Sequence, residues 1–156
     1  MDIKIVNYKN SDSEEVSSLV RRVSKKYLFQ KDQADASFSY INLFDPKKNS
    51  TLAEEYQTSP IFLIAKQDGK IVGMARARRI EKLSNLFIEG RLQRQGFGSI
   101  LLKRFETVAK NQGWKKVKLN SSPTSIIFYE KNGYKKSTNL KKGRHGLIIQ
   151  PMRKIL

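Results

Sequence analysis

The chain has 156 residues, the size of one ordinary domain, with 38% hydrophobic residues and a formal net charge of +17. The absence of cysteine and the presence of only one histidine, His145, exclude disulfides, thiolate metal sites and most zinc sites. No apolar run approaches the ~20 residues of a membrane span, and the N-terminus lacks the apolar stretch of a signal peptide. We therefore expect a soluble, cytoplasmic protein with no metal and no membrane partner.

The positive charge is unevenly distributed along the chain. Nine of the fourteen acidic residues lie at or before Glu55, and only Glu130 follows Glu106. A basic C-terminal third attracts polyanions, so nucleic acid, anionic lipid and phosphorylated cofactors are candidate partners. A well-solvated, lysine-rich surface accounts for the same composition, and both interpretations stay open.

The first third of the chain predicts one strand followed mainly by helices. Alternating polar and apolar residues predict a strand over residues 3–6. Ser11 and Glu14 have the spacing of a capping box, and apolar residues at helical spacing predict a helix over residues 13–29. Residues 30–60 have a weaker pattern, which we interpret as helical.

The middle of the chain predicts three strands. Residues 61–65 form an apolar run suited to a buried strand, and residues 71–75 begin the returning strand. Asp68 and Gly69 between them predict a hairpin turn, because this pair tolerates positive φ angles. Residues 82–88 predict a fourth strand, in which the uneven spacing of the apolar residues suggests a bulge.

The second half of the chain predicts helices alternating with strands. In chain order, these are a helix over 98–112, a strand over 114–119, a helix over 122–132, and strands over 134–139 and 147–154, separated by the loop 141–146. Gly113 and Gly133 follow the two helices, a position at which glycine commonly ends a helix. With no internal repeat and no low-complexity linker, residues 1–156 are expected to form one α/β domain.

A glycine-containing turn lies between the fourth strand and the next helix, with Gln93, Gly96 and Gly98 at its centre. Glycine permits positive φ and close approach of a ligand, and the first helical turn exposes unpaired N–H groups at the positive end of the dipole. Arg91 and Arg94 add charge, so the turn suits a pyrophosphate, although glycines also occur in such turns for steric reasons. The sequence has no Gly-Lys-Ser/Thr motif, and the turn follows four strands rather than one, which argues against P-loop and dinucleotide folds.

Two segments in this order resemble the GNAT superfamily of N-acetyltransferases, in particular its small bacterial and archaeal members. Residues 86–99, Leu-Phe-Ile-Glu-Gly-Arg-Leu-Gln-Arg-Gln-Gly-Phe-Gly-Ser, resemble its acetyl-CoA-binding motif. Residues 120–123, Asn-Ser-Ser-Pro, and 128–134, Phe-Tyr-Glu-Lys-Asn-Gly-Tyr, resemble its second signature. The resemblance covers most of the chain and is weakest over residues 30–60, where acceptor-binding helices lie in the family. It implies a mixed, mostly antiparallel sheet flanked by helices, which splays between the fourth and fifth strands.

The resemblance also implies acetyl-CoA as the acetyl donor and an amine of a small molecule or protein as the acceptor. Backbone groups of Phe87 and Ile88 would bond the pantetheine arm within the splay, and the side-chain amide of Asn120 would contact the same arm. The Tyr129 hydroxyl would point at the sulfur of CoA. Backbone N–H groups of the turn would hold the pyrophosphate, from Gln93, Arg94, Gln95, Gly96, Phe97, Gly98 and Ser99.

These residue types suit direct attack of an amine on the thioester. A tyrosine hydroxyl, with a pKa of about 10, can protonate a departing thiolate whose own pKa is about 8.5. Tyr129 also fits a core aromatic on an amphipathic helix, and Asn120 also fits a polar strand end. Glu81 and Glu89 flank the fourth strand, but the pattern places neither of them, so no general base is assigned. His145 could approach the acceptor from its loop, where a solvated histidine is the simpler interpretation.

The acceptor and the assembly stay open. If a basic cluster in the third and fourth strands lines the acceptor site, it would disfavour polyamines and favour acceptors that carry a carboxylate or phosphate. This cluster consists of Arg76, Arg78, Arg79 and Lys82. The alternative function is that of a basic binding protein, which keeps the fold but acts on RNA, ribosomes or another polyanion without catalysis. Because small members of the family are often dimers, a homodimer is a further alternative.

Overall fold

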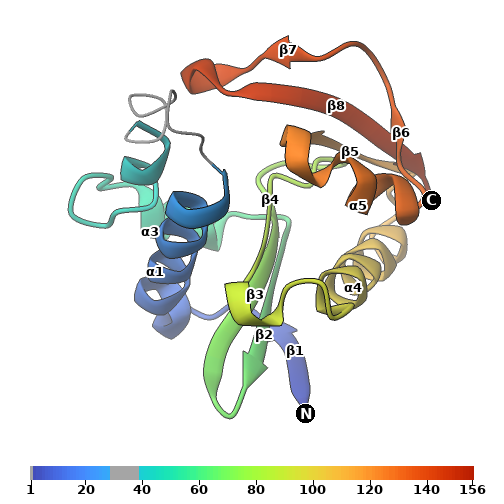
Figure 1. Cartoon of the computed structure of the whole chain (residues 1–156). Coiled ribbons are helices and arrows are strands. Elements are labelled where there is room, and N and C mark those ends of the chain that lie inside the picture. The colour runs from blue at the N-terminus through green and yellow to red at the C-terminus, as the bar shows by residue number, and fades with distance from the viewer. Residues whose placement is uncertain (1, 29–38) are drawn as a thin grey trace.

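The fold consists of two β-sheets that meet along one line and diverge from it (Figure 1). The computed structural model describes residues 2–28 and 39–156. The first sheet has the strand order β1-β2-β3-β4, with β1 (Ile3–Asn7), β2 (Ile61–Gln67), β3 (Lys70–Ala77) and β4 (Asn85–Ile88). The second has the order β5-β8-β6, with β5 (Lys116–Ser121), β8 (Ile148–Ile155), β6 (Lys135–Lys136) and, also paired with β8, β7 (Lys141–Lys142).

The hairpin between β2 and β3 has the expected turn. Asp68 and Gly69 have φ angles of 51° and 77°, and positive values at both central positions match the right-handed twist of the flanking strands. The predicted bulge is misplaced. The register shifts between β2 and β3, where Ala65 pairs with Gly73 but Lys66 pairs with Ile71, which leaves Val72 of β3 as the extra residue; β3 and β4 pair without a shift.

The strand predicted over residues 82–88 is divided between the two sheets, and this division creates the splay. Lys82 bridges Lys118 in parallel, and the Leu83 N–H donates to the Lys118 carbonyl at 2.9 Å. After this contact β4 pairs with β3, whereas β5 pairs with β8. One edge of each sheet therefore faces the gap, which confirms the splay expected between the fourth and fifth strands.

Helices cover both faces of the first sheet (Figure 1). The longer helices are α1 (Ser13–Val23), continued by a π-helical turn (Ser24–Leu28), α3 (Leu52–Gln57), α4 (Phe97–Asn111) and α5 (Ile126–Lys131). Short 3₁₀ turns span Asn10–Asp12, Gly90–Leu92, Pro123–Ser125 and Arg144–Gly146. Apolar residues of α1 and α3 form one core with one face of β2 and β3, and those of α4 and α5 form a second core with the other face and with β5.

Three local predictions need correction. Ser11 does not cap α1; the helix has Asp12 as its N-cap, whose carboxylate accepts from the Lys9 N–H at 2.9 Å and pairs with Lys66 at 2.9 Å. The α-helical part ends at Val23, because the chain changes to π-helical hydrogen bonding there. The expected loop 141–146 contains β7 and a 3₁₀ turn, because its first residues pair with β8.

The prediction of helices over residues 30–60 is tested only in part. Residues 39–42 are helical and α3 occupies the end of the region, whereas residues 29–38 lie outside the described part of the chain. Within the described residues, no helix has both the length and the apolar character needed to cross a bilayer.

Candidate functional site

The turn before α4 has two left-handed residues. Arg94 has a φ of 61° and Gly96 a φ of 87°, and α4 begins directly afterwards at Phe97. No side chain caps the start of α4, so the N–H groups of its first turn have no intrahelical partner. Two left-handed residues directly before an uncapped helix start are compatible with the predicted anion site, because successive backbone N–H groups in such turns can converge on one anion.

Side chains of the turn brace its backbone. The Gln93 Nε2 donates to the Ile88 carbonyl at 3.0 Å, and the Gln95 Nε2 donates to the Arg91 carbonyl at 2.8 Å. The Arg91 guanidinium in turn donates to Gln67 Oε1 at 2.7 Å, which ties the turn to the end of β2. The predicted anion site is therefore held by three hydrogen bonds, while the Arg94 side chain is exposed.

The two glycines of the turn have different roles. A Cβ on Gly96 would meet no atom within 4 Å, so only its positive φ requires glycine. A Cβ on Gly98 would lie 3.2 Å from the Phe128 ring of α5. The Asn132 Nδ2 donates to Ser99 Oγ at 3.1 Å beside this contact. The small residue at Gly98 thus allows α5 to pack on the first turn of α4, and so links the turn to the helix that carries Tyr129.

Of the predicted pair Phe87 and Ile88, only one residue directs its backbone N–H and C=O groups to the gap. The Glu89 N–H donates to the Val72 carbonyl at 2.8 Å, which directs Glu89 toward β3. Because backbone direction alternates along a strand, the backbone groups of Ile88 point to the gap and those of Phe87 to β3. The Ile88 carbonyl already accepts from Gln93 there, so the geometry favours Ile88 over Phe87 as a backbone contact for a ligand in the gap.

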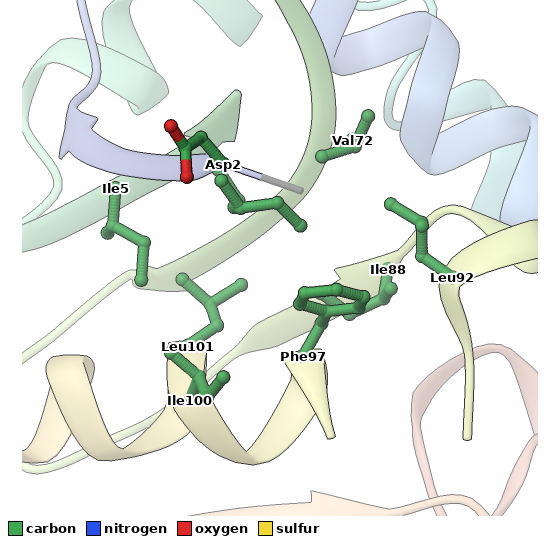
Figure 2. A pocket seen from close by; sticks show the side chains of 10 residues that line it. Asp2, Ile5, Val72, Ile88, Leu92, Phe97, Ile100 and Leu101 are labelled. Carbon is green, nitrogen blue, oxygen red and sulfur yellow. The ribbon is translucent and has the colours of Figure 1, made fainter. Parts of the chain in front are cut away.

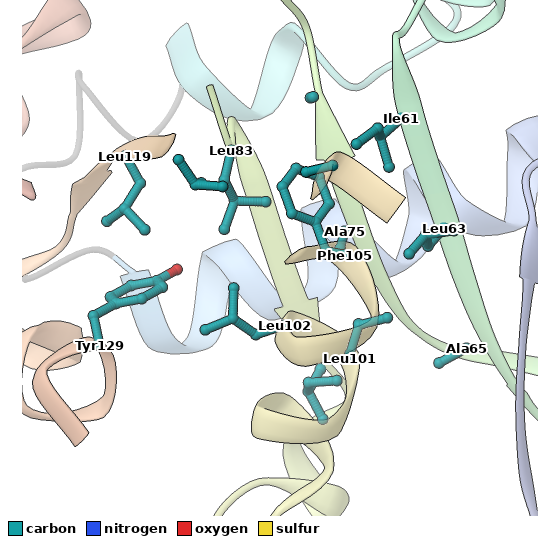
Figure 3. Packing of buried hydrophobic residues seen from close by; sticks show 14 of the residues in the cluster. Ile61, Leu63, Ala65, Ala75, Leu83, Leu101, Leu102, Phe105, Leu119 and Tyr129 are labelled. Carbon is teal, nitrogen blue, oxygen red and sulfur yellow. The ribbon is translucent and has the colours of Figure 1, made fainter. Parts of the chain in front are cut away.

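Tyr129 lies in the core below the splay and is only 9% exposed. Its ring packs edge-on against Phe128 at 5.0 Å and Tyr134 at 5.6 Å between centroids. Figure 3 shows its hydroxyl pointing away from α5, toward the side of the cluster where Leu83 and Leu102 lie. Burial, reinforced by the nearby phenol of Tyr40, raises the pKa of Tyr129 and keeps it protonated at neutral pH. Tyr129 can therefore pack in the core and still keep the hydroxyl proton that a general acid needs.

Asn120 lies on the opposite side of β5 from the core. Its side chain is exposed, whereas its neighbours Leu119 and Ser121 are buried. The structure places Asn120 opposite Pro151 of β8, at the strand that borders the gap. Its amide therefore stays available to a ligand in the splay, and it is separated from the face that Tyr129 packs against.

A polar chain that the sequence did not reveal lies near Tyr129. The Arg76 guanidinium donates to Asn85 Oδ1 at 3.4 Å, and Asn85 Nδ2 donates to the Tyr40 hydroxyl at 3.5 Å. Since arginine can only donate, it orients the Asn85 amide, which in turn donates to Tyr40. The one sequence signal for this site is a polar residue, Asn85, at the start of an otherwise apolar strand.

Arg76 is an unusual member of this chain because it is only 2% exposed. Its other hydrogen bonds go to Ser59 Oγ at 2.8 Å and the Glu55 carbonyl at 3.1 Å, and its guanidinium lies 5.0 Å from the Tyr56 ring centre. Burial lowers the pKa of Arg76, although it stays a cation. No carboxylate forms an ion pair with it in the described part of the chain.

Both acids considered as a general base have structural roles. The Glu81 carboxylate accepts the backbone N–H groups of Lys115 and Lys116, each at 3.2 Å. Glu89 forms an ion pair with Arg22 at 2.6 Å. The side chain of His145 lies outside what the structure describes. The geometry thus provides no unengaged carboxylate among these candidates.

A small cavity lies beside the first turn of α4 but does not reach Tyr129. It has a volume of about 210 Å³, and its lining is apolar apart from Asp2 (Figure 2). Phe97, Ile100 and Leu101 of α4 form one wall and Ile5 of β1 lies opposite. Such a lining does not suit a phosphate. Among the residues that the structure describes, no group of three acidic or histidine side chains is placed to hold a metal ion.

Comparison with known proteins identifies relatives of this fold. The family model described as an acetyltransferase (GNAT) domain matches residues 28–156. A GCN5-related N-acetyltransferase from Rhodopseudomonas palustris is 18% identical with a TM-score of 0.84, covering 100% of this chain and 97% of that chain. The PaiA N-acetyltransferase from Thermoplasma acidophilum, in complex with coenzyme A, is 19% identical with a TM-score of 0.74, and 100% of each chain is covered. The ribosomal-protein-S18-alanine N-acetyltransferase from Escherichia coli is 16% identical with a TM-score of 0.68, covering 99% of this chain and 94% of that chain.

Proposed function

Because this chain belongs to the GNAT acetyltransferase family, we propose that it transfers the acetyl group of acetyl-CoA to an amine of a small molecule or a protein. The observation that carries the proposal is the uncapped start of α4 behind the left-handed residues Arg94 and Gly96. A pyrophosphate collects several hydrogen bonds at such a turn. Both ends of the reaction have support among the relatives: PaiA is in complex with coenzyme A, and the Escherichia coli relative is named for an alanine acceptor on a ribosomal protein.

In this proposal the splay binds the rest of the donor. The backbone of Ile88 at the free edge of β4 pairs with the pantetheine arm, in exchange for the Gln93 side chain that now occupies its carbonyl. Asn120 lies in β5, the strand that borders the gap, and contacts the same arm with its side-chain amide. Backbone N–H groups from Gln93 to Ser99 hold the pyrophosphate, with Arg94 adding charge.

Tyr129 is the proposed proton donor. When bound, acetyl-CoA supplies a thioester that an amine attacks directly; in the whole reaction the amine loses one proton and the sulfur gains one. The difference between the ordinary pKa values of tyrosine and a thiol is about 1.5 units, so the proton transfer costs only ~2 kcal/mol. Burial raises the pKa of Tyr129, and it raises that of a thiol at the same place for the same reason, since both anions lose hydration. The cost therefore stays small in the core.

The proton of the amine leaves to water in this proposal. Glu81 and Glu89 are engaged by backbone N–H groups and by Arg22, respectively. These contacts already occupy both carboxylates and direct them to structural partners. Water at the mouth of the splay is the remaining proton acceptor, and it needs no specific residue.

The acceptor end is proposed to be the chain Arg76–Asn85–Tyr40. The Arg76 guanidinium donates to the Asn85 amide oxygen, and the Asn85 amide nitrogen donates to the Tyr40 hydroxyl. The phenol of Tyr40 also contributes, after burial, to raising the pKa of Tyr129, which couples this chain to the proposed proton donor. The buried guanidinium of Arg76 makes this end of the site positive, which favours an acceptor with a carboxylate near its amine.

The test replaces Tyr129 by phenylalanine, with Tyr134→Phe as the matched control. Both variants lose one buried hydroxyl from the same aromatic cluster, but the Tyr134 hydroxyl is bonded to Glu106 at 2.8 Å. We expect Tyr129→Phe to lower kcat by about 100-fold or more, the usual contribution of a general acid, with acetyl-CoA binding unchanged. Tyr134→Phe should lower the melting temperature and leave kcat within a few-fold of the wild type.

Two results would count against the proposal. If kcat of Tyr129→Phe equals that of the control, Tyr129 is a core residue only. If acetyl-CoA at high concentration does not raise the melting temperature of the wild-type protein, the donor does not bind, because binding to the native state stabilises it by mass action. That second outcome would favour the alternative of a non-catalytic polyanion-binding protein, for which the net charge of +17 is the supporting observation.

A further inference from the structure

Five cations form one row across the second sheet and the turn beside it. Each member is the direct cross-strand partner of the next, as the bridges and strand registers show. We call these residues the cationic row; in spatial order they are Arg79, Lys82, Lys118, Arg153 and Lys135. They come from four separate segments of the chain, so the row is visible only in the folded protein.

The row faces outward from the sheet. Direct partners in a sheet project from the same face, and successive residues of a strand alternate between faces. Val117, Leu119 and Met152 flank Lys118 and Arg153 along their strands and are buried in the core with α4 and α5. Lys118, Arg153 and their partner in β6 therefore project from the opposite face, where all three are exposed.

This arrangement costs stability within the protein. Like charges directly opposite each other in a sheet are destabilising. Burial and then the charges of Arg79, Lys141 and Lys118 lower the pKa of Lys82, and no acid acts in the other direction. Glu81, which lies within the same turn, directs its carboxylate to backbone N–H groups instead. The repulsion is thus left uncompensated by the described part of the chain.

We propose that the cationic row is a docking surface for the phosphate backbone of a nucleic acid. At ~4.8 Å between neighbouring strands, the row extends over ~19 Å and presents regularly spaced point charges. One strand of a nucleic acid rises ~3.4 Å per phosphate, so the row spans about six successive phosphates. An acidic peptide would match this spacing of charges only if it contained a continuous run of Asp and Glu.

The chemistry of the row specifies the mode of binding. Its members are cations, without an aromatic side chain among them on which bases could stack. Contacts of this kind position a nucleic acid but read no sequence. None of the five residues takes part in the acetyl transfer proposed above, and a nucleic acid docked on them would lie beside the join of the two sheets, which Lys82 and Lys118 form.

The test compares two triple variants with equal loss of charge. The row variant carries Lys118→Gln, Lys135→Gln and Arg153→Gln. The control variant carries three substitutions of exposed lysines elsewhere, namely Lys70→Gln, Lys110→Gln and Lys131→Gln. Fluorescence anisotropy measures binding of the full chain to a labelled single-stranded RNA of about 20 nucleotides, from about 50 to about 200 mM salt.

For the row variant we expect the slope of log Kobs against log salt to become shallower by about 2, or ~0.7 for each lost phosphate contact. The control variant should keep nearly the wild-type slope and affinity. Acetyl-CoA should raise the melting temperature of both variants as it does for the wild type, which separates this inference from the proposed function. If the row variant does not fold, Arg153→Gln alone, which lies between Lys118 and Lys135, should reduce the slope by about 0.7.

Three outcomes would overturn the inference. Equal loss of binding in the two triple variants would mean that only the diffuse net charge attracts RNA. Tighter binding of a poly-glutamate peptide than of RNA, lost in the row variant, would assign the row to an acidic protein. Absence of RNA binding by the wild-type protein at the lowest salt would exclude nucleic acid altogether.

Discussion

Replacing Gly96 by alanine tests the anion site most directly, because the structure separates conformational from steric effects there. A Cβ at Gly96 would meet nothing within 4 Å, so crowding contributes nothing. The φ of 87° is left-handed, and an L-residue in that region is destabilised by ~1–2 kcal/mol. We therefore expect Gly96→Ala to lower the free energy of unfolding by ~1–2 kcal/mol, which for a domain of this size lowers Tm by roughly 2–8 °C.

Gly98→Ala is the matched control within the same turn. The added Cβ would lie 3.2 Å from the Phe128 ring, which must move by a few tenths of an ångström. Alanine is favoured over glycine in a helix by about 1 kcal/mol, and this gain offsets the contact. Gly98→Ala should therefore leave Tm nearly unchanged.

Acetyl-CoA affinity provides the second measurement. If Gly96→Ala relaxes out of the left-handed region, one N–H group no longer points at the pyrophosphate. A hydrogen bond to a charged group contributes ~1.5–3 kcal/mol, so Kd measured by calorimetry should rise roughly 10- to 150-fold. Wild-type Tm and Kd in Gly96→Ala, or equal losses in both variants, would refute the assignment of this turn as the anion site.

Two further predictions concern the buried phenols and the acceptor end. Burial first of all raises the pKa of Tyr40, Tyr129 and Tyr134 above the unfolded value of about 10. Their contribution to stability is thus present below about pH 10 and lost as the pH rises through the folded values, so urea unfolding should show a declining free energy above about pH 10. A free energy of unfolding that stays constant above about pH 10 would contradict this. Asn85→Ala removes the link between Arg76 and Tyr40, and we expect KM for the acceptor to rise about 10-fold with KM for acetyl-CoA unchanged; an unchanged acceptor KM would argue against this link as part of the acceptor site.

Several features of the site followed from local sequence. Asp68–Gly69 and the glycines after the helices have positive φ, as expected from residues whose conformational range decides the turn. The glycine turn before α4 was located for the same reason, because a left-handed residue followed by a helix start is a local property. The order of two spaced motifs then indicated the GNAT family, and the family model agrees.

Other features were beyond local reasoning because they depend on which strands pair. The strand expected over residues 82–88 is divided, since Lys82 pairs with Lys118 while Asn85 pairs with Arg76. The bulge was predicted in the wrong strand because apolar spacing does not reveal a register shift, which is a property of two strands. Burial of Arg76 was also hidden, because its surroundings come from distant segments.

Near neighbours in the chain were enough to establish the order of the elements and the turn before α4, because periodicity, glycine conformation and helix starts are local properties. The folded arrangement was needed to show where the sheets join, that Glu81 and Glu89 are engaged, and that basic residues from separate segments align in the cationic row. These features depend on pairing, burial and electrostatic repulsion, which act between residues far apart in the chain. Their partners are fixed when the two sheets close on α4.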